Sequence, residues 1–154
     1  MVFRRTKMHI AFYTDSNGGS PQNTEIFNAL NKAVDERSIK DASLFYNYVE
    51  FSPVSNKFGM FNSADMWSFT GNLIATTMEN TIAAARIVNK FKLSYLYSEQ
   101  DKERFGVLEL FRLARSVPVI VTGEEDSDEV FRLTGVEPLK IKELSIDEIK
   151  KVLS

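Results

Sequence analysis

Short apolar runs alternate with stretches of helical periodicity along this chain. Runs of apolar and β-branched residues predict buried strands, and VPVIVT at 117–122 is the most apolar of them. The strands are expected at 8–14, 42–49, 64–69, 92–97, 117–122 and 138–142, and the residues 72–76 either continue the third strand or begin another.

Between these runs, apolar residues recur at helical spacing. In the first such stretch Ile26, Phe27 and Leu30 lie on one face of a helix. Helices are expected at 23–36, 78–90, 101–115, 126–133 and 145–153.

Capping residues and helix breakers mark the borders of these elements. Asn23 or Thr24 is expected to cap the first helix. Ser145 and Glu148 have the spacing of a capping box at the start of the last helix. The irregular stretch 50–63, with its proline and glycine, predicts a loop.

Strands that alternate with helices are typical of a parallel sheet with helices on both faces. We therefore expect an α/β fold: a single open, mainly parallel sheet in a Rossmann-like three-layer αβα arrangement. Residues 8–154 are expected to form one domain, and 1–7 either an extension or an edge strand.

The composition of the chain limits the kinds of site and partner that it can have. The chain has 154 residues and no cysteine, so thiol catalysis and thiolate metal sites are excluded. Its formal charge of −2 disfavours binding of nucleic acid. His9, the only histidine, falls inside a predicted strand, so no zinc site is expected and no metal site is predicted. No apolar run reaches the roughly 20 residues of a membrane span. A cytoplasmic location is expected.

Ligands of open α/β sheets bind beyond the carboxyl ends of the strands. Four loops are expected to follow strands and to line one rim: 15–20, 69–72, 98–104 and 122–128. The ligand-binding residues predicted in them are Ser16, Asn17, Gly18, Gly19, Ser20, Thr70, Gly71, Asn72, Ser98, Glu99, Arg104, Thr122 and Glu125. The alternative is that these small polar residues serve only the turns.

The loop DSNGGS at 15–20 has neither the dinucleotide pattern G-x-G-x-x-G nor the P-loop lysine. Gly18 and Gly19 would let backbone N–H groups approach an anion or a sugar, with the helix start behind them. A plain strand-to-helix turn is the other interpretation. Arg104 either meets a phosphate or carboxylate of a ligand or lies on a solvated helix face.

Four segments together resemble the nucleotide-sugar glycosyltransferases of the GT-B type, and more narrowly short glycosyltransferase-like proteins of T4-like bacteriophages. They are HIAFYTDSNGGSPQNTEIFNAL, ADMWSFTGNLIATT, YLYSEQDKERFG and PVIVTGEEDSDEVF. The resemblance implies that a nucleotide sugar, as donor substrate, or a sugar acceptor binds in a strand-end cleft, with no further cofactor assigned. It also implies a location in the host cytoplasm.

In that resemblance Gly18, Gly19 and Ser20 match the loop after the first strand, and Asp15 is a candidate base. Glu124 is a second candidate catalytic carboxylate. GT-B enzymes have two such domains and this chain has room for one. The resemblance therefore implies an acceptor-type half, an enzyme completed by a homodimer, or a domain that has lost catalysis.

Two other functions remain open from the sequence. One is a non-catalytic binding or interaction module of Rossmann-like fold. The other is a nucleoside deoxyribosyltransferase-like enzyme, which needs a nucleophilic carboxylate at a strand end. Glu99, Glu124 and Glu125 are the candidates for that nucleophile.

Overall fold

The computed structural model describes residues 9–39, 42–52, 54–87 and 91–154. The predicted extension or edge strand at 1–7 lies outside these residues. None of the described helices is both long enough and apolar enough to span a membrane.

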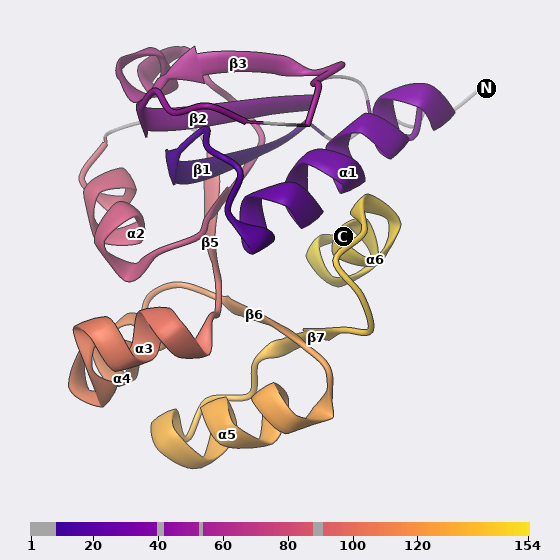
Figure 1. Cartoon of the computed structure of the whole chain (residues 1–154). Helices are drawn as coiled ribbons and strands as arrows, with labels where there is room; N and C mark the ends of the chain where they lie inside the picture. The colour runs from indigo at the N-terminus through magenta and orange to yellow at the C-terminus, as the bar shows by residue number, and fades with distance from the viewer. Residues whose placement is uncertain (1–8, 40–41, 53, 88–90) are drawn as a thin grey trace, which may run out of the picture.

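Within the described residues, seven strands form one open sheet in the order β3-β2-β1-β4-β5-β6-β7 (Figure 1). Every neighbouring pair is parallel. The strands are β1 (Ile10–Ser16), β2 (Ala42–Tyr48), β3 (Gly59–Asn62), β4 (Asn72–Ala75), β5 (Lys92–Leu96), β6 (Val119–Thr122) and β7 (Leu139–Ile141). The prediction of a single open parallel sheet is confirmed.

Helices cover both faces of the sheet because successive strand residues point to opposite sides. Ile10 and Phe12 of β1 pack with α1 (Pro21–Glu36) and α6 (Ile146–Leu153) on one face. Ala11 and Tyr13 face the other side. That side is covered by the short 3-10 helix η1 (Ser63–Ser68), α2 (Met78–Ala85), α4 (Val107–Leu113) and α5 (Glu124–Thr134). The three-layer arrangement is therefore as predicted.

The helix starts follow from their capping residues. Ser20, not Asn23 or Thr24, caps α1: its side chain accepts a hydrogen bond from the Asn23 N–H, and a proline occupies the first turn. Ser145 caps α6 and accepts from the Glu148 N–H, as its spacing predicted. Each cap satisfies backbone donors that the first helical turn leaves unpaired.

Three elements differ from the sequence prediction. The expected strand at 64–69 is η1, whose start is capped by Asn62. β3 lies inside the expected loop 50–63. The expected helix 101–115 is two helices, α3 (Glu99–Phe105) and α4, because Gly106 between them has a φ of 94° that breaks the helical path.

Candidate functional site

A polar cavity of about 330 Å³ lies at the carboxyl ends of β1, β4 and β5. β1 and β4 are neighbours in the sheet, but the helices that follow them, α1 and α2, lie on opposite faces. This is the topological switch point, where open α/β sheets bind ligands. We call this cavity the crevice. The described residues that line it are all polar or charged: Asp15, Ser16, Ser20, Gln22, Asn23, Thr76, Thr77, Ser98, Gln100, Asp101 and Arg104.

Asn23 holds the β1–α1 wall of the crevice. Its Nδ2 donates to the backbone oxygens of Ser16 and Gly18, each at 2.9 Å. The side chain is buried, at 6% exposure, so these bonds form away from solvent. The conformation of the loop therefore depends on one buried amide in the first turn of α1.

The β4–α2 wall consists of two threonines. The Thr76 N–H donates to the Tyr13 carbonyl at 3.0 Å, and the Thr77 hydroxyl caps α2 by accepting from the Asn80 N–H at 3.0 Å. The helices α1 and α2 both begin at the crevice, so the positive ends of two helix dipoles meet there.

Asp101 of α3 is a buried carboxylate in the crevice, with 7% exposure. Its Oδ2 accepts from the Met78 N–H at 2.8 Å and from the Tyr95 hydroxyl at 2.5 Å. Burial raises the pKa of Asp101, while the hydrogen bonds from Tyr95 and Met78 act in the opposite direction. Burial, followed by the charge of Asp101, raises the pKa of Tyr95 strongly, so the proton stays on the phenol.

A chain of side chains supports Asp15 from the sheet. The Tyr13 hydroxyl donates to Asn47 Oδ1 at 2.8 Å. Asn47 Nδ2 donates to Asp15 Oδ1 at 3.3 Å and to Asn80 Oδ1 at 3.1 Å. Burial raises the pKa of Tyr13, so its hydroxyl is kept as a donor. Asn80 is itself buried, and its Nδ2 has no partner among the described residues.

The crevice includes only some of the residues predicted from the sequence. Asp15, Ser16, Ser20, Ser98 and Arg104 line it. Asn17, Gly18 and Gly19 belong to the same β1–α1 loop, and Gly18 is buried within it. Glu99 begins α3, is exposed and does not line the crevice.

The loop 69–72 does not share this rim, and its predicted placement is wrong. Thr70, Gly71 and Asn72 precede β4 instead of following a strand, so they lie at the amino edge of the sheet. The Asn72 N–H donates to the backbone oxygen of His9 at 2.9 Å, at the start of β1. The strand was misplaced because η1 occupies 63–68 and β4 begins only at residue 72.

The loop after β6 also stands apart from the crevice. Glu124 forms an ion pair with Lys140 of β7, and Glu125 is exposed on α5. Neither lines the crevice. Thr122 lines a different hollow of about 730 Å³. The prediction that all four loops lie at one rim therefore fails for 69–72. The loop 122–128 follows β6, which is parallel to β5, so it lies at the same carboxyl edge as 15–20 and 98–104, but it does not line the crevice.

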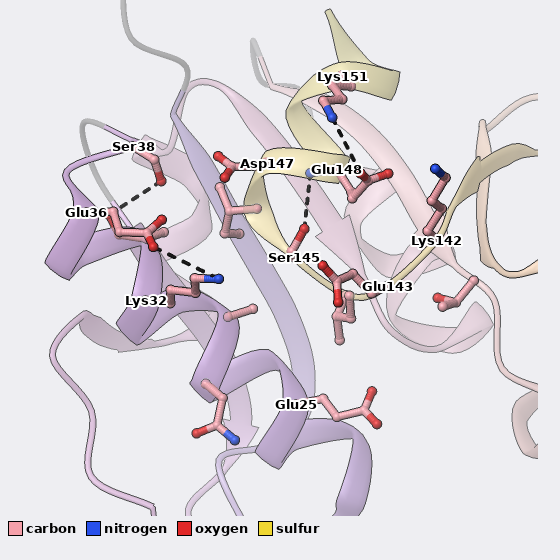
Figure 2. Close-up of a pocket in the computed structure, with 16 residues that line it drawn as sticks. Glu25, Lys32, Glu36, Ser38, Lys142, Glu143, Ser145, Asp147, Glu148 and Lys151 are labelled. Carbon is pink, nitrogen blue, oxygen red and sulfur yellow. Dashed lines mark hydrogen bonds and ion pairs between the residues drawn. The ribbon is translucent and has the colours of Figure 1, made fainter.

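We call this second space the α1–α6 hollow; Figure 2 shows its lining residues on α1, on α6 and on the segment between β7 and α6. It is the larger of the two, but two ion pairs form between its own lining side chains. Lys32 pairs with Glu36, and Lys151 with Glu148. Exposed pairs of this kind are typical of a solvated surface.

A half-buried ion pair fixes α3, which carries Asp101, against α5. Lys102 pairs with Glu129, beside the buried Tyr97. Burial, and then the charge of Glu129, raises the pKa of Tyr97 to about 12. The hydrogen bond with Glu129 raises the pKa of Lys102, while the Lys102 bond lowers that of Glu129, so both groups stay charged.

Sequence reasoning missed six lining residues: Gln22, Asn23, Thr76, Thr77, Gln100 and Asp101. The two threonines follow directly from a correctly placed β4. Asp101 gave a weaker signal: it stands three residues after Ser98, where an acid in the first helical turn is common for helix-dipole reasons alone. Its burial depends on how α3 docks, which the sequence does not specify.

Comparison with known proteins adds no relative: no family model, no curated protein and no solved structure matches this chain. Among the residues that the structure describes, no three or more His, Cys, Asp or Glu side chains gather as metal ligands.

Proposed function

We propose that this chain is a glycosyltransferase-like protein that binds a nucleotide sugar or a sugar acceptor in the crevice between β1 and β4. The observation that carries the proposal is the lining by described residues: hydroxyls, amides, two carboxylates and one guanidinium, with no apolar side chain among them. Sugar hydroxyls both donate and accept hydrogen bonds, and these groups match them. The volume of about 330 Å³ is at the small end of the range for ligand cavities.

The charges of the crevice also suit a phosphate beside the sugar. Arg104 is the one cation among the lining residues that the structure describes, and its guanidinium can hold phosphate oxygens in a bidentate manner. The helix starts of α1 and α2 add partial positive charge at the same place. A nucleobase would find no apolar wall among the described residues of the crevice, so the sugar and phosphate groups are the parts of the ligand that we assign to it.

Transfer of a sugar requires a general base that takes the proton of the acceptor hydroxyl. The crevice holds two carboxylates, Asp15 and Asp101. Burial raises the pKa of Asp101, and a carboxylate with a raised pKa accepts a proton more readily. Asp15 is the more exposed of the two carboxylates. Glu99, Glu124 and Glu125 do not line the crevice, so the deoxyribosyltransferase-like alternative finds none of its expected nucleophiles there.

Calorimetric titration with UDP-glucose, GDP-mannose, ADP-glucose and free glucose tests the proposal. A variant that fills the crevice, Gln100→Trp, is compared with Glu103→Trp, which changes an exposed residue of the same helix outside the lining. We expect at least one probe to bind the wild type and Glu103→Trp equally, and Gln100→Trp at least tenfold more weakly. Absence of binding by every probe, or equal binding by Gln100→Trp, would refute the proposal.

Sedimentation of the same samples tests the predicted homodimer. In the two-domain enzymes that the sequence resembles, donor and acceptor bind to separate domains, and a second copy of this chain would supply the second one. Sedimentation as a monomer in the presence of bound ligand would contradict a homodimer without affecting the binding site.

A further inference from the structure

Glu50 lies just beyond the carboxyl end of β2 and is fixed against the β1–α1 loop. Ser16 at the end of β1 pairs with Tyr48 at the end of β2. The Asn17 N–H donates to the Tyr48 carbonyl at 3.2 Å, and the Glu50 N–H donates to Asn17 Oδ1 at 2.7 Å. The backbone at Glu50 therefore cannot move independently of the loop that lines the crevice.

The carboxylate of Glu50 lies over Gly18 in this loop. Its Oε2 accepts from the Ser16 hydroxyl at 3.2 Å, and that hydroxyl also accepts from the Gly18 N–H at 3.2 Å. A Cβ at position 18 would stand 2.5 Å from Oε2 and 3.0 Å from the Glu50 Cβ. Gly18 thus lacks a side chain where the glutamate needs the space.

The carboxylate retains free hydrogen-bonding capacity. In the described part of the chain, its recorded partner is one neutral hydroxyl, and no cation pairs with it. A carboxylate has about four lone-pair positions and accepts from two adjacent hydroxyl groups at once. Ser16 lines the crevice, so the carboxylate is one hydrogen bond away from a ligand bound there.

We propose that Glu50 binds the vicinal hydroxyl pair of a sugar ring that extends from the crevice across Ser16 and Gly18, an inference that rests on the proposed function. In dinucleotide-binding α/β sheets an acidic residue after the second strand accepts the ribose hydroxyls, and β2 of this chain ends in the same position relative to the switch point. The exposed rings of Tyr48, two residues before Glu50, and Phe51, directly after it, are available for stacking.

The hydroxyl pair can come from a ribose or from a pyranose, and three probes separate the two sources. They are UDP-glucose, its analogue with 2′-deoxyuridine, and its analogue with 2-deoxyglucose. Each is titrated into the wild type, Glu50→Ala, Glu50→Gln and the control Glu25→Ala, an exposed acid on α1 outside the crevice. Thermal midpoints of the variants confirm that each is folded.

We expect Glu50→Ala to bind UDP-glucose at least tenfold more weakly, Glu50→Gln to lie between the two, and Glu25→Ala to equal the wild type. The deoxy analogue that lacks the recognised hydroxyl should bind the wild type more weakly, and Glu50→Ala should no longer distinguish it from UDP-glucose. Unchanged affinity in Glu50→Ala, with weak binding by Gln100→Trp, would refute the role of Glu50 and keep the crevice. Absence of binding by the wild type with UDP-glucose, GDP-mannose, ADP-glucose and free glucose alike would refute both.

Discussion

The crevice and the α1–α6 hollow both include residues that follow strands, but they differ in the burial and the hydrogen-bond partners of their polar side chains. In the hollow, Lys32 and Glu36 are 68% and 50% exposed and pair with each other at 4.0 Å. In the crevice, Asn23 and Asp101 are only 6% and 7% exposed. The side chains of both form hydrogen bonds with backbone groups. The hollow is larger, but the crevice is preorganised, and fixed groups bind a small ligand at a lower entropic cost.

The largest effect should come from removing the carboxylate of Asp101. In Asp101→Ala the Met78 N–H and the Tyr95 hydroxyl lose their buried acceptor. Unsatisfied buried donors cost about 1–3 kcal/mol each, so we expect the loss of two partners to lower the free energy of unfolding by about 2–6 kcal/mol. Urea denaturation measures it.

The matched control for this change is Asp147→Ala, an exposed acid in the α1–α6 hollow. It should lose about 0.5 kcal/mol or less, because it removes only an interaction with the α6 dipole. Equal losses in the two variants would show that the crevice is no better organised than the hollow.

A smaller effect is expected at Asn23, whose amide holds the β1–α1 loop. Asn23→Ala removes two hydrogen bonds from a buried side chain and should cost about 1–2 kcal/mol in unfolding free energy. Asn28→Ala changes the same residue type on the same helix at an exposed position in the hollow. It should be neutral or slightly stabilising, because alanine favours the helix.

Amide hydrogen exchange gives a second comparison of Asn23→Ala with Asn28→Ala. Loss of the Asn23 amide should speed exchange of the Gly18 and Ser20 amides, while Asn28→Ala leaves them unchanged. An unaltered β1–α1 loop in Asn23→Ala would contradict the role that we give to this residue.

The smallest effect is a dependence of stability on pH. Because burial raises the pKa of Asp101 in the folded state, the native protein binds more protons than the unfolded chain between the ordinary carboxyl pKa, about 3.9, and the raised value. The contribution of Asp101 to stability therefore falls as pH rises through that interval. We expect the wild type to lose stability there relative to Asp101→Asn, which does not titrate.

Denaturation of the two proteins at pH values from 4 upward in small steps measures this difference. A rise in the wild-type stability relative to Asp101→Asn across the interval would contradict the raised pKa and the sign that follows from it.

Local patterns were sufficient for much of the fold. The continuous run of buried residues in β1 and the apolar face of α1 indicate a sheet between two helical layers. The same patterns failed at η1, where ADMWSF has the composition of a strand but the Asn62 cap starts a 3-10 turn. That one error moved the predicted ligand loop from Thr76 and Thr77 to Thr70–Asn72, on the opposite edge of the sheet.

By itself the sequence determined the parallel α/β architecture and the position of DSNGGS after β1, because hydrophobic periodicity and capping act over a few residues. Only the tertiary structure decided that the buried Asp101 accepts a hydrogen bond from the Met78 N–H and that Glu50 lies over Gly18. Each of these contacts joins residues more than twenty positions apart in the chain. They depend on how helices and strands dock, and spacing along the chain carries no information about that docking.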